Sequence, residues 1–353
     1  MPSADQGCRL LAASYLRKQA KRLAAQIDGA RRGDNPESVH QARVASRRLR
    51  AGLRMFRECF DPERLKTWRK QIRRVTTKLG DARDKDVQIA YLCDVLDDLD
   101  EKACYSGIAR LLARLERQRE RIQPEVVEAV DRFQSSGVLE QMLTVSKAVL
   151  SEAGSQAAGV PSACALAEPQ RHILDNLDRV LSCQDSLSDP EDRQRHHAMR
   201  IAAKRLRYTL EISAPVYAGQ LDAVVEAIKR VQTLLGEVHD CDVWGEQLQT
   251  FAVKERRRIL KYFGHVAPFA RLEVGIEHLQ QQRQRRRQQV FQELVDDWQE
   301  LNRRREWEKL VEMVRGSAAT GGPSSSVDST VGQARCGTPH FKAAGHPSGC
   351  PGS

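Results

Sequence analysis

Aromatic residues are scarce in this sequence, and long apolar runs are missing. Phe, Trp and Tyr make up 5% of the 353 residues, which disfavours a surface that stacks single-stranded bases between aromatic rings. No stretch approaches the roughly 18 consecutive apolar residues of a membrane-spanning helix. The N-terminus also lacks an apolar signal core ahead of a small-residue cleavage site. These absences predict a soluble cytoplasmic protein with no membrane partner.

Regular cysteine patterns and nucleotide-binding loops are also missing. The nine cysteines include no CxxC pair, so neither a metal ribbon nor a disulfide framework is expected. No Gly-rich loop ends in Lys-Ser or Lys-Thr, the arrangement that cradles nucleotide phosphates. We therefore expect reduced thiols, no metal, no cofactor and no catalytic activity.

What the chain does have is a basic segment that is built twice. The formal net charge is +10, and residues 38–58 contain six arginines but one glutamate. At about 100° per residue, the basic side chains of this segment share one helix face and the apolar ones share the opposite face. The basic face consists of His40, Arg43, Arg47, Arg50 and Arg54, and 157 positions later it returns as His197, Arg200, Lys204 and Arg207.

A second pattern is also duplicated. Residues 75–87 align with 231–243, with Leu79-Gly80 matching Leu235-Gly236. A tandem of related halves favours two similar units that meet through matched faces about an approximate twofold axis. Because the clear periods are helical, the sequence predicts an all-α fold of two helical bundles around a basic central groove.

The predicted helices follow from the apolar period and from Gly and Pro. Gly80 and Gly236 are expected to end helices, 151–169 to link the halves 8–150 and 170–314, and 316–353 to be disordered. The helices are expected at 8–29, 37–59, 62–79, 84–121 and 124–150, and then at 170–184, 190–213, 219–235, 240–262 and 269–314.

The duplicated basic faces indicate an anion-binding surface, because arginine offers paired donors to phosphate oxygens. The alternative is a solvated face, or pairing of these arginines with Asp84, Asp86, Asp240 and Asp242. Lys66, Arg69 and Lys70 lack clear basic counterparts in the second copy and are expected to face water. The predicted ligand set is His40, Arg43, Arg47, Arg48, Arg50, Arg54, Arg73, Arg74, Lys78, His197, Arg200, Lys204, Arg205, Arg207, Lys229 and Arg230.

These motifs resemble the CHAD family, the conserved histidine α-helical domain. The matching residues are His40, Arg43, Arg47-Arg48-Leu49-Arg50, Leu79-Gly80 and Arg83-Asp84, and then His197, Arg200, Lys204-Arg205-Leu206-Arg207, Leu235-Gly236 and Asp240. Over residues 8–314, the resemblance implies two pseudosymmetric four-helix bundles whose basic helices bind inorganic polyphosphate, at polyphosphate granules. His239 departs from the first copy, which has Arg83 there. The two leading histidines either donate to phosphate or hold their helices in place.

Two other functions are open from the sequence. A nucleic-acid binder would use the same phosphate contacts, and the run Arg283–Arg287 is compatible with it. A metal-dependent phosphohydrolase would use His197 and the doublet His239-Asp240. Arg83 occupies the equivalent of His239 and cannot ligate a metal, so we expect Asp240 to cap a helix instead.

Overall fold

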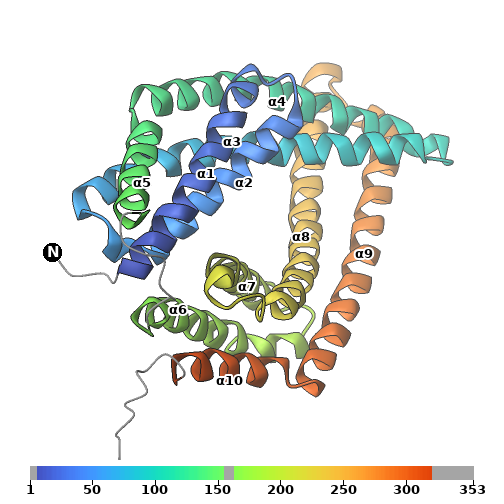
Figure 1. Ribbon diagram of the computed structural model, residues 1–353. Helices are drawn as coiled ribbons and strands as arrows, with labels where there is room; N and C mark the ends of the chain where they lie inside the picture. Colours follow the sequence, from blue (N-terminus) through green and yellow to red (C-terminus); the bar gives the residue numbers. More distant parts are fainter. Residues whose placement is uncertain (1–5, 155–162, 320–353) are drawn as a thin grey trace, which may run out of the picture. The chain divides into compact units, whose positions relative to one another are not determined.

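The structure is entirely helical where it is described. The computed structural model describes residues 6–154 and 163–319, and within these ranges there are ten α-helices and no β-strand (Figure 1). This confirms the predicted all-α class. The α-helices are α1 (Gln6–Arg32), α2 (Pro36–Met55), α3 (Pro62–Asp97), α4 (Lys102–Ser135), α5 (Val138–Gly154), α6 (Ala163–Leu181), α7 (Arg193–Ser213), α8 (Asp222–Phe263), α9 (Ala270–Arg303) and α10 (Glu306–Ala319). Short 3-10 turns are η1 (Arg57–Cys59), η2 (Gln184–Ser188), η3 (Ala214–Val216) and η4 (Ala267–Phe269).

Polar caps fix the starts of the helices that carry the basic residues. The Asn35 side chain accepts a hydrogen bond from the backbone N–H of Glu37, and Pro36 opens α2. Asp61 caps α3 in the same way. Such caps satisfy backbone donors that have no partner within the helix. The start predicted at Asp189-Pro190 is wrong, because Asp192 caps α7 instead.

The breaks predicted at Gly80 and Gly236 are wrong. Both glycines lie inside long helices, α3 and α8. Glycine costs a helix interior about 1 kcal/mol relative to alanine, whereas the apolar face of α3 continues through buried Leu79 and Ala82 on either side of Gly80. Burial of this face outweighs the propensity. Asp240 is accordingly inside α8 and caps no helix.

Other predicted boundaries are also displaced. The break predicted at 122–123 is absent, because α4 continues through Pro124. The chain instead leaves α4 at Gly137, which has a φ of 64°, before α5 begins. The predicted linker 151–169 is helical at both ends, since α5 reaches Gly154 and α6 begins at Ala163. Of the predicted disordered tail, 316–319 belong to α10. Residues 155–162 and 320–353 lie outside the described ranges.

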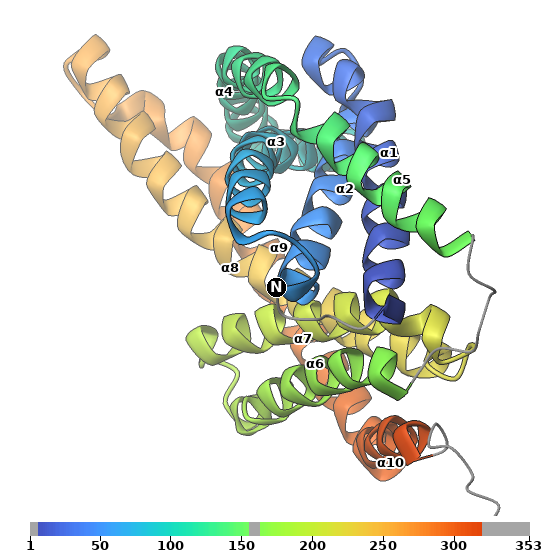
Figure 2. The same ribbon diagram turned by 60° about the vertical axis from the view of Figure 1, so that its left-hand side comes forward.

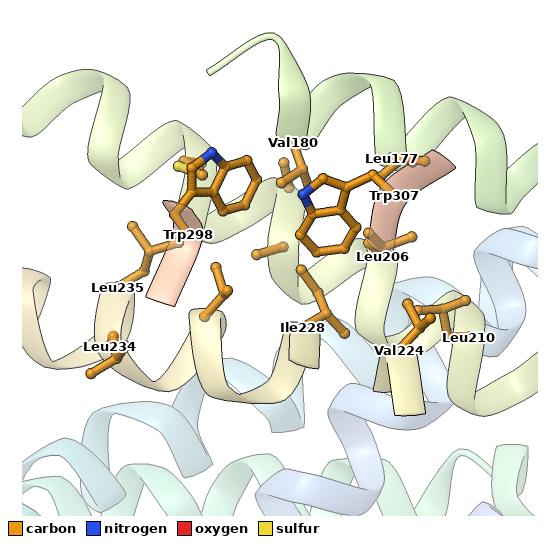
Figure 3. Packing of buried hydrophobic residues seen from close by; sticks show 14 of the residues in the cluster. Leu177, Val180, Leu206, Leu210, Val224, Ile228, Leu234, Leu235, Trp298 and Trp307 are labelled. Atoms are coloured by element: carbon orange, nitrogen blue, oxygen red, sulfur yellow. The ribbon is translucent and has the colours of Figure 1, made fainter. Parts of the chain in front are cut away.

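Each half of the chain builds its own apolar core. Helices α1 to α5 surround a cluster that includes Leu49 and Trp68, and helices α6 to α10 surround a second one. Figure 3 shows the second cluster, in which Trp298 and Trp307 stack with ring centroids 5.3 Å apart beside Leu206 and Ile228. Five helices therefore line each core, one more than the four-helix type that the resemblance implied.

A third core joins the halves and explains the length of α3, α4, α8 and α9. Apolar residues from the far ends of all four helices pack together there, among them Leu92, Ile108 and Leu248. The α4–α9 crossing within it is very close, because Gly107 and Gly275 meet backbone to backbone. None of the helices in the described ranges combines the length and apolar character needed to cross a bilayer.

Candidate anion-binding site

Basic side chains of α2 and α7 meet where these two helices pack together. Burial, reinforced by Arg47 and Arg200 and then by Arg43 and Arg207, lowers the pKa of the Lys204 ammonium to about 7. Burial also lowers the pKa of Arg47, which lies near Arg43, Arg200 and Arg207. Burial and nearby positive charges both disfavour the protonated form of a basic side chain. The two copies of the basic face therefore form one cationic cluster.

This cluster opens into a cleft of about 540 Å³, which we call the inner cleft. Its lining comes mainly from α2, α3, α6 and α7, and Figure 2 shows how these helices are arranged. Its lining contains nine arginine and lysine side chains but one carboxylate, that of Asp175. The nine are Arg47, Arg50, Arg54, Arg57, Arg69, Arg171, Arg179, Lys204 and Arg205. Like charges this close raise the potential of the cleft, so it attracts anions.

A second cleft of about 870 Å³, the outer cleft, lies between α2, α3 and α4. It shares Arg50, Arg54 and Arg69 with the inner cleft and adds Lys70, Arg73 and Arg74 from α3. Its α4 wall carries Glu125 and Glu128, which are engaged by Lys78 at 2.6 Å and by Arg132 at 2.5 Å. The basic walls of the two clefts are thus continuous along α2 and α3.

The predicted ligand residues divide into unpaired and paired cations. Unpaired ones form no ion pair with any described residue, and so their charge is available to an anion. They are Arg47, Arg50, Arg54, Arg73, Arg74, Arg200, Lys204 and Arg205, and except for Arg73, Arg74 and Arg200 all of them line the inner cleft.

The remaining predicted cations are held by carboxylates. Arg48 and Arg207 both pair with Glu211, at 3.1 and 3.5 Å. The other ion pairs are Arg43 with Asp84, Lys78 with Glu125 and Asp81, Lys229 with Glu226, and Arg230 with Asp297 and Glu293. Lys229 and Arg230 line neither cleft. The structure therefore does not bring them to the surface that they were predicted to share with Arg73 and Arg74.

The leading histidines are half-buried and take different partners in the two copies. Burial and, next, the charge of Arg83 lower the pKa of His40, whose Nδ1 has no hydrogen-bond partner among the described residues. His197 Nδ1 lies 3.4 Å from Nδ1 of His239. Burial, with Arg200 and His197, lowers the pKa of His239. Neither histidine lines a cleft described above.

The motif carboxylates after each Leu-Gly mainly tie helices together. Asp86 pairs with Arg119 of α4 at 2.6 Å, and Asp242 pairs with Arg287 of α9 at 2.7 Å. All four side chains are at most 12% exposed. These acids therefore bind arginines of the following helices, whereas only Asp84 pairs with the basic face of α2, as the alternative interpretation allowed.

The basic run Arg283–Arg287 is largely engaged inside the protein. The Arg283 guanidinium lies 3.7 Å from the ring centre of Tyr91, and Arg286 pairs with Glu237 at 2.6 Å. Arg287 is buried against Asp242. Arg283 and Arg287 are thus engaged within the protein, whereas Arg286 is paired but partly exposed.

Sequence reasoning missed several cleft residues. Arg69 and Lys70 are exposed, as expected, and they also line the clefts: Arg69 lines both and Lys70 lines the outer one. The four-residue spacing of Arg69 and Arg73 on one face of α3 could have indicated this. Arg171 and Arg179 come from α6, which lies outside the two duplicated segments from which the ligand set was predicted.

Fold and site together define an all-helical protein with a cationic cleft between duplicated basic helices. The CHAD domain model matches residues 14–249, and this chain belongs to the CHAD domain family. The match covers the basic helices of both copies and most of α8.

Curated sequences and solved structures are similar to this chain over much of its length. Two uncharacterized proteins from two strains of Mycobacterium tuberculosis are each 27% identical over 222 residues, which cover 63% of this chain and 42% of theirs. The CHAD domain from the plant Ricinus communis is 24% identical with a TM-score of 0.52, over 77% of this chain and 86% of that one. PptA from Streptomyces chartreusis is 17% identical with a TM-score of 0.55, over 82% and 98%. At these identities the two structures support the fold alone.

Proposed function

We propose that this protein binds inorganic polyphosphate through the inner cleft and the adjoining outer cleft. The observation that carries the proposal is the charge of the inner cleft, where nine cationic side chains face one carboxylate. Folding holds these cations together at an electrostatic cost, and a phosphate chain would relieve that cost. Family membership favours the same ligand.

A linear polymer suits this surface better than a single phosphate. Arg50, Arg54 and Arg69 belong to both clefts, so one chain could pass from the inner to the outer cleft without leaving the basic wall. Charge-assisted bonds from guanidinium groups to phosphate oxygens are about twice as strong as neutral ones. Such contacts need no reader for base edges.

The nucleic-acid alternative lacks a stacking platform. Tyr208 is the one aromatic ring among the described residues that line the two clefts, apart from the imidazole of His172. Single-strand binders derive about 1–3 kcal/mol from each base stacked on an aromatic ring. We therefore propose preference for polyphosphate, and localisation at polyphosphate granules follows from that preference.

We also propose that the two halves are related by approximate twofold symmetry. Matching contacts support this relation: Arg43 lies over Gly80 and Arg200 over Gly236, at 3.6 and 3.8 Å from the position of an added Cβ. The buried pair of Asp86 with Arg119 likewise matches that of Asp242 with Arg287.

A competition titration tests the proposed ligand. Full-length protein is bound to labelled long-chain polyphosphate at moderate salt, and unlabelled polyphosphate, RNA or DNA of equal total charge is added. We expect polyphosphate to compete at least about tenfold better than either nucleic acid. Equal competition by all three would contradict polymer-specific binding. Incubation of the same complex with Mg²⁺ or Mn²⁺ tests the phosphohydrolase alternative, which predicts chain shortening, whereas binding without catalysis predicts intact polymer.

A further inference from the structure

The close crossing of α4 and α9 fixes the register of these two helices outside the basic clefts, and so the positions of Glu101 and His278 relative to each other. A Cβ at Gly275 would lie 2.1 Å from the carbonyl oxygen of Cys104, and one at Gly107 would lie 2.2 Å from that of Leu272. The helices are therefore antiparallel here and touch backbone to backbone. One turn beyond the Cys104–Gly275 contact, the same register sets Glu101 opposite His278.

Three metal-ligating groups converge at this crossing. The Cys104 thiol, the Glu101 carboxylate and the His278 imidazole form the one group of this kind in the described ranges, with ligand atoms within 4.8 Å of one another. His278 Nδ1 lies 3.8 Å from Glu101 Oε2. Cys104 is buried, His278 is partly exposed and Glu101 is exposed. The donor set is closed on the side of the helices and open to solvent on the other.

We propose that Glu101, Cys104 and His278 bind a divalent cation of the zinc type, with water as a fourth ligand. Thiolate, imidazole and carboxylate are the ligands that Zn²⁺ takes, in tetrahedral sites with bonds of about 2.0–2.3 Å. The thiolate makes Mg²⁺ and Ca²⁺ poor occupants, since these prefer oxygen alone. A bound ion would join the start of α4 to α9 and so fasten the two halves where they cross.

The charge around this group favours a cation, unlike the rest of this basic protein. Asp97, Asp98 and Asp100 lie at the α3–α4 turn, and Glu277 is next to His278. All four of these carboxylates are exposed. Negative charge gathered at a small site raises the local concentration of cations. The site is thus opposite in sign to the inner cleft, and no phosphate ligand is needed to explain it.

Cobalt binding to the full-length, reduced protein without polyphosphate tests the proposal. Co²⁺ replaces Zn²⁺ in such sites, and coordination by a thiolate produces a near-ultraviolet charge-transfer band. We expect this band at one equivalent of Co²⁺ and its loss on addition of Zn²⁺. Cys104→Ser should abolish the band, and His278→Ala should weaken binding by about tenfold or more. Binding should also strengthen as pH rises, because the Cys104 thiol must lose its proton to coordinate a metal.

Matched cysteine variants separate this site from others. Cys8 Sγ and Cys59 Sγ lie 3.5 Å apart and offer Co²⁺ a rival pair of thiolates. Cys59→Ser and Cys93→Ser should leave the band unchanged, with helical circular dichroism confirming that each variant folds. A band that survives Cys104→Ser, or one lost in Cys59→Ser, would overturn the assignment, as would no band at all. Polyphosphate affinity takes no part in this test, so its outcome is independent of the proposed function.

Discussion

The two copies of the basic segment differ most at the positions where their faces approach the clefts. Arg54 in α2 has Glu211 as its counterpart in α7, and Lys70 in α3 has Glu226 in α8. Glu211 pairs with Arg207 of its own helix and with Arg48 of the other copy. Glu226 pairs with Lys229. A cation of the first copy has therefore become, in the second copy, an acid that neutralises its neighbours.

The two copies thus share their buried Asp–Arg ion pairs but differ in the charge of the residues near the clefts. Asp86 with Arg119 and Asp242 with Arg287 remain equivalent. The free cations, in contrast, come mainly from α2 and α3, and α7 contributes Lys204 and Arg205 to the inner cleft. We infer that the first copy supplies most of the ligand surface and the second mainly completes the cleft.

The largest expected effect concerns the preserved framework. Asp86→Ala leaves the nearly buried Arg119 without a carboxylate partner, and Asp242→Ala leaves buried Arg287 with only its longer contact to exposed Glu191, at 3.6 Å. Each change should cost about 3–5 kcal/mol. Urea unfolding should show losses of this size in both variants. The control Asp81→Ala removes an exposed partner of Lys78 and should cost at most about 1 kcal/mol. A large loss in only one of the two buried pairs would break the equivalence.

Removing two cations from the first copy should lower polyphosphate affinity far more than removing two from the second copy. Arg50→Ala with Arg54→Ala takes away two unpaired cleft cations, and hydrogen bonds to charged groups contribute about 1.5–3 kcal/mol each. Affinity for long-chain polyphosphate should therefore fall by about 100-fold or more. Lys229→Ala with Arg230→Ala removes cations that carboxylates already hold. That variant should bind within about threefold of the wild type in calorimetric titration. Similar losses in both variants would remove the asymmetry.

Lys204 should make binding depend on pH. With a pKa of about 7 in the free protein, this ammonium is charged below that pH and neutral above it. A bound polyanion favours the charged form, so binding takes up a proton and affinity falls as pH rises through 7. Since loss of the Lys204 charge removes one favourable contact with the polyanion, we expect affinity to fall by about threefold to tenfold between pH 6 and pH 8.

Lys204→Arg supplies the control for this prediction, because it gives α7 the residue that α2 has at Arg47. Arginine stays charged throughout this range, so the variant should keep its affinity from pH 6 to pH 8. If wild type and variant lose affinity equally, then the pH dependence comes from other groups.

The smallest expected effect is a gain. Glu211→Gln should free Arg48 and Arg207, whose side chains are 28% and 18% exposed. We expect polyphosphate affinity to rise by about twofold to fivefold, a change of about 1 kcal/mol or less. Titration at low and high salt would measure it, because screening weakens the gain. A loss of affinity would mean that Glu211 positions these arginines for the ligand.

Some of this could be predicted from the sequence, because periodicity reports which face of a helix is buried. The basic and apolar faces of α2 and α7 and the all-helical class followed from local patterns. Each half has five helices, as predicted, only because unpredicted breaks at 98–101 and 304–305 replace the predicted ones at Gly80 and Gly236. The breaks predicted at Gly80 and Gly236 are absent from the structure, because packing of the whole helix outweighs the low helix propensity of one glycine.

The site was harder to predict because ion pairs form between residues that are close in the structure but far apart in the sequence. Arg48 and Glu211 are 163 residues apart, and nothing in either segment indicates that one neutralises the other. Arg171 and Arg179 line the inner cleft from α6, which lies outside the two duplicated segments. Lys229 and Arg230 aligned with Arg73 and Arg74 but are turned toward acids. Alignment of the copies therefore overestimated their functional symmetry.

The position of a bound phosphate chain tests the unequal contribution of the two copies most directly. A crystal structure of the full-length protein with long-chain polyphosphate should show phosphate oxygens within hydrogen-bond distance of Arg50, Arg54 and Arg69, where the inner and outer clefts join. A chain that instead follows Lys229 and Arg230 on α8, and leaves the inner cleft empty, would contradict the assignment of the ligand surface to the first copy.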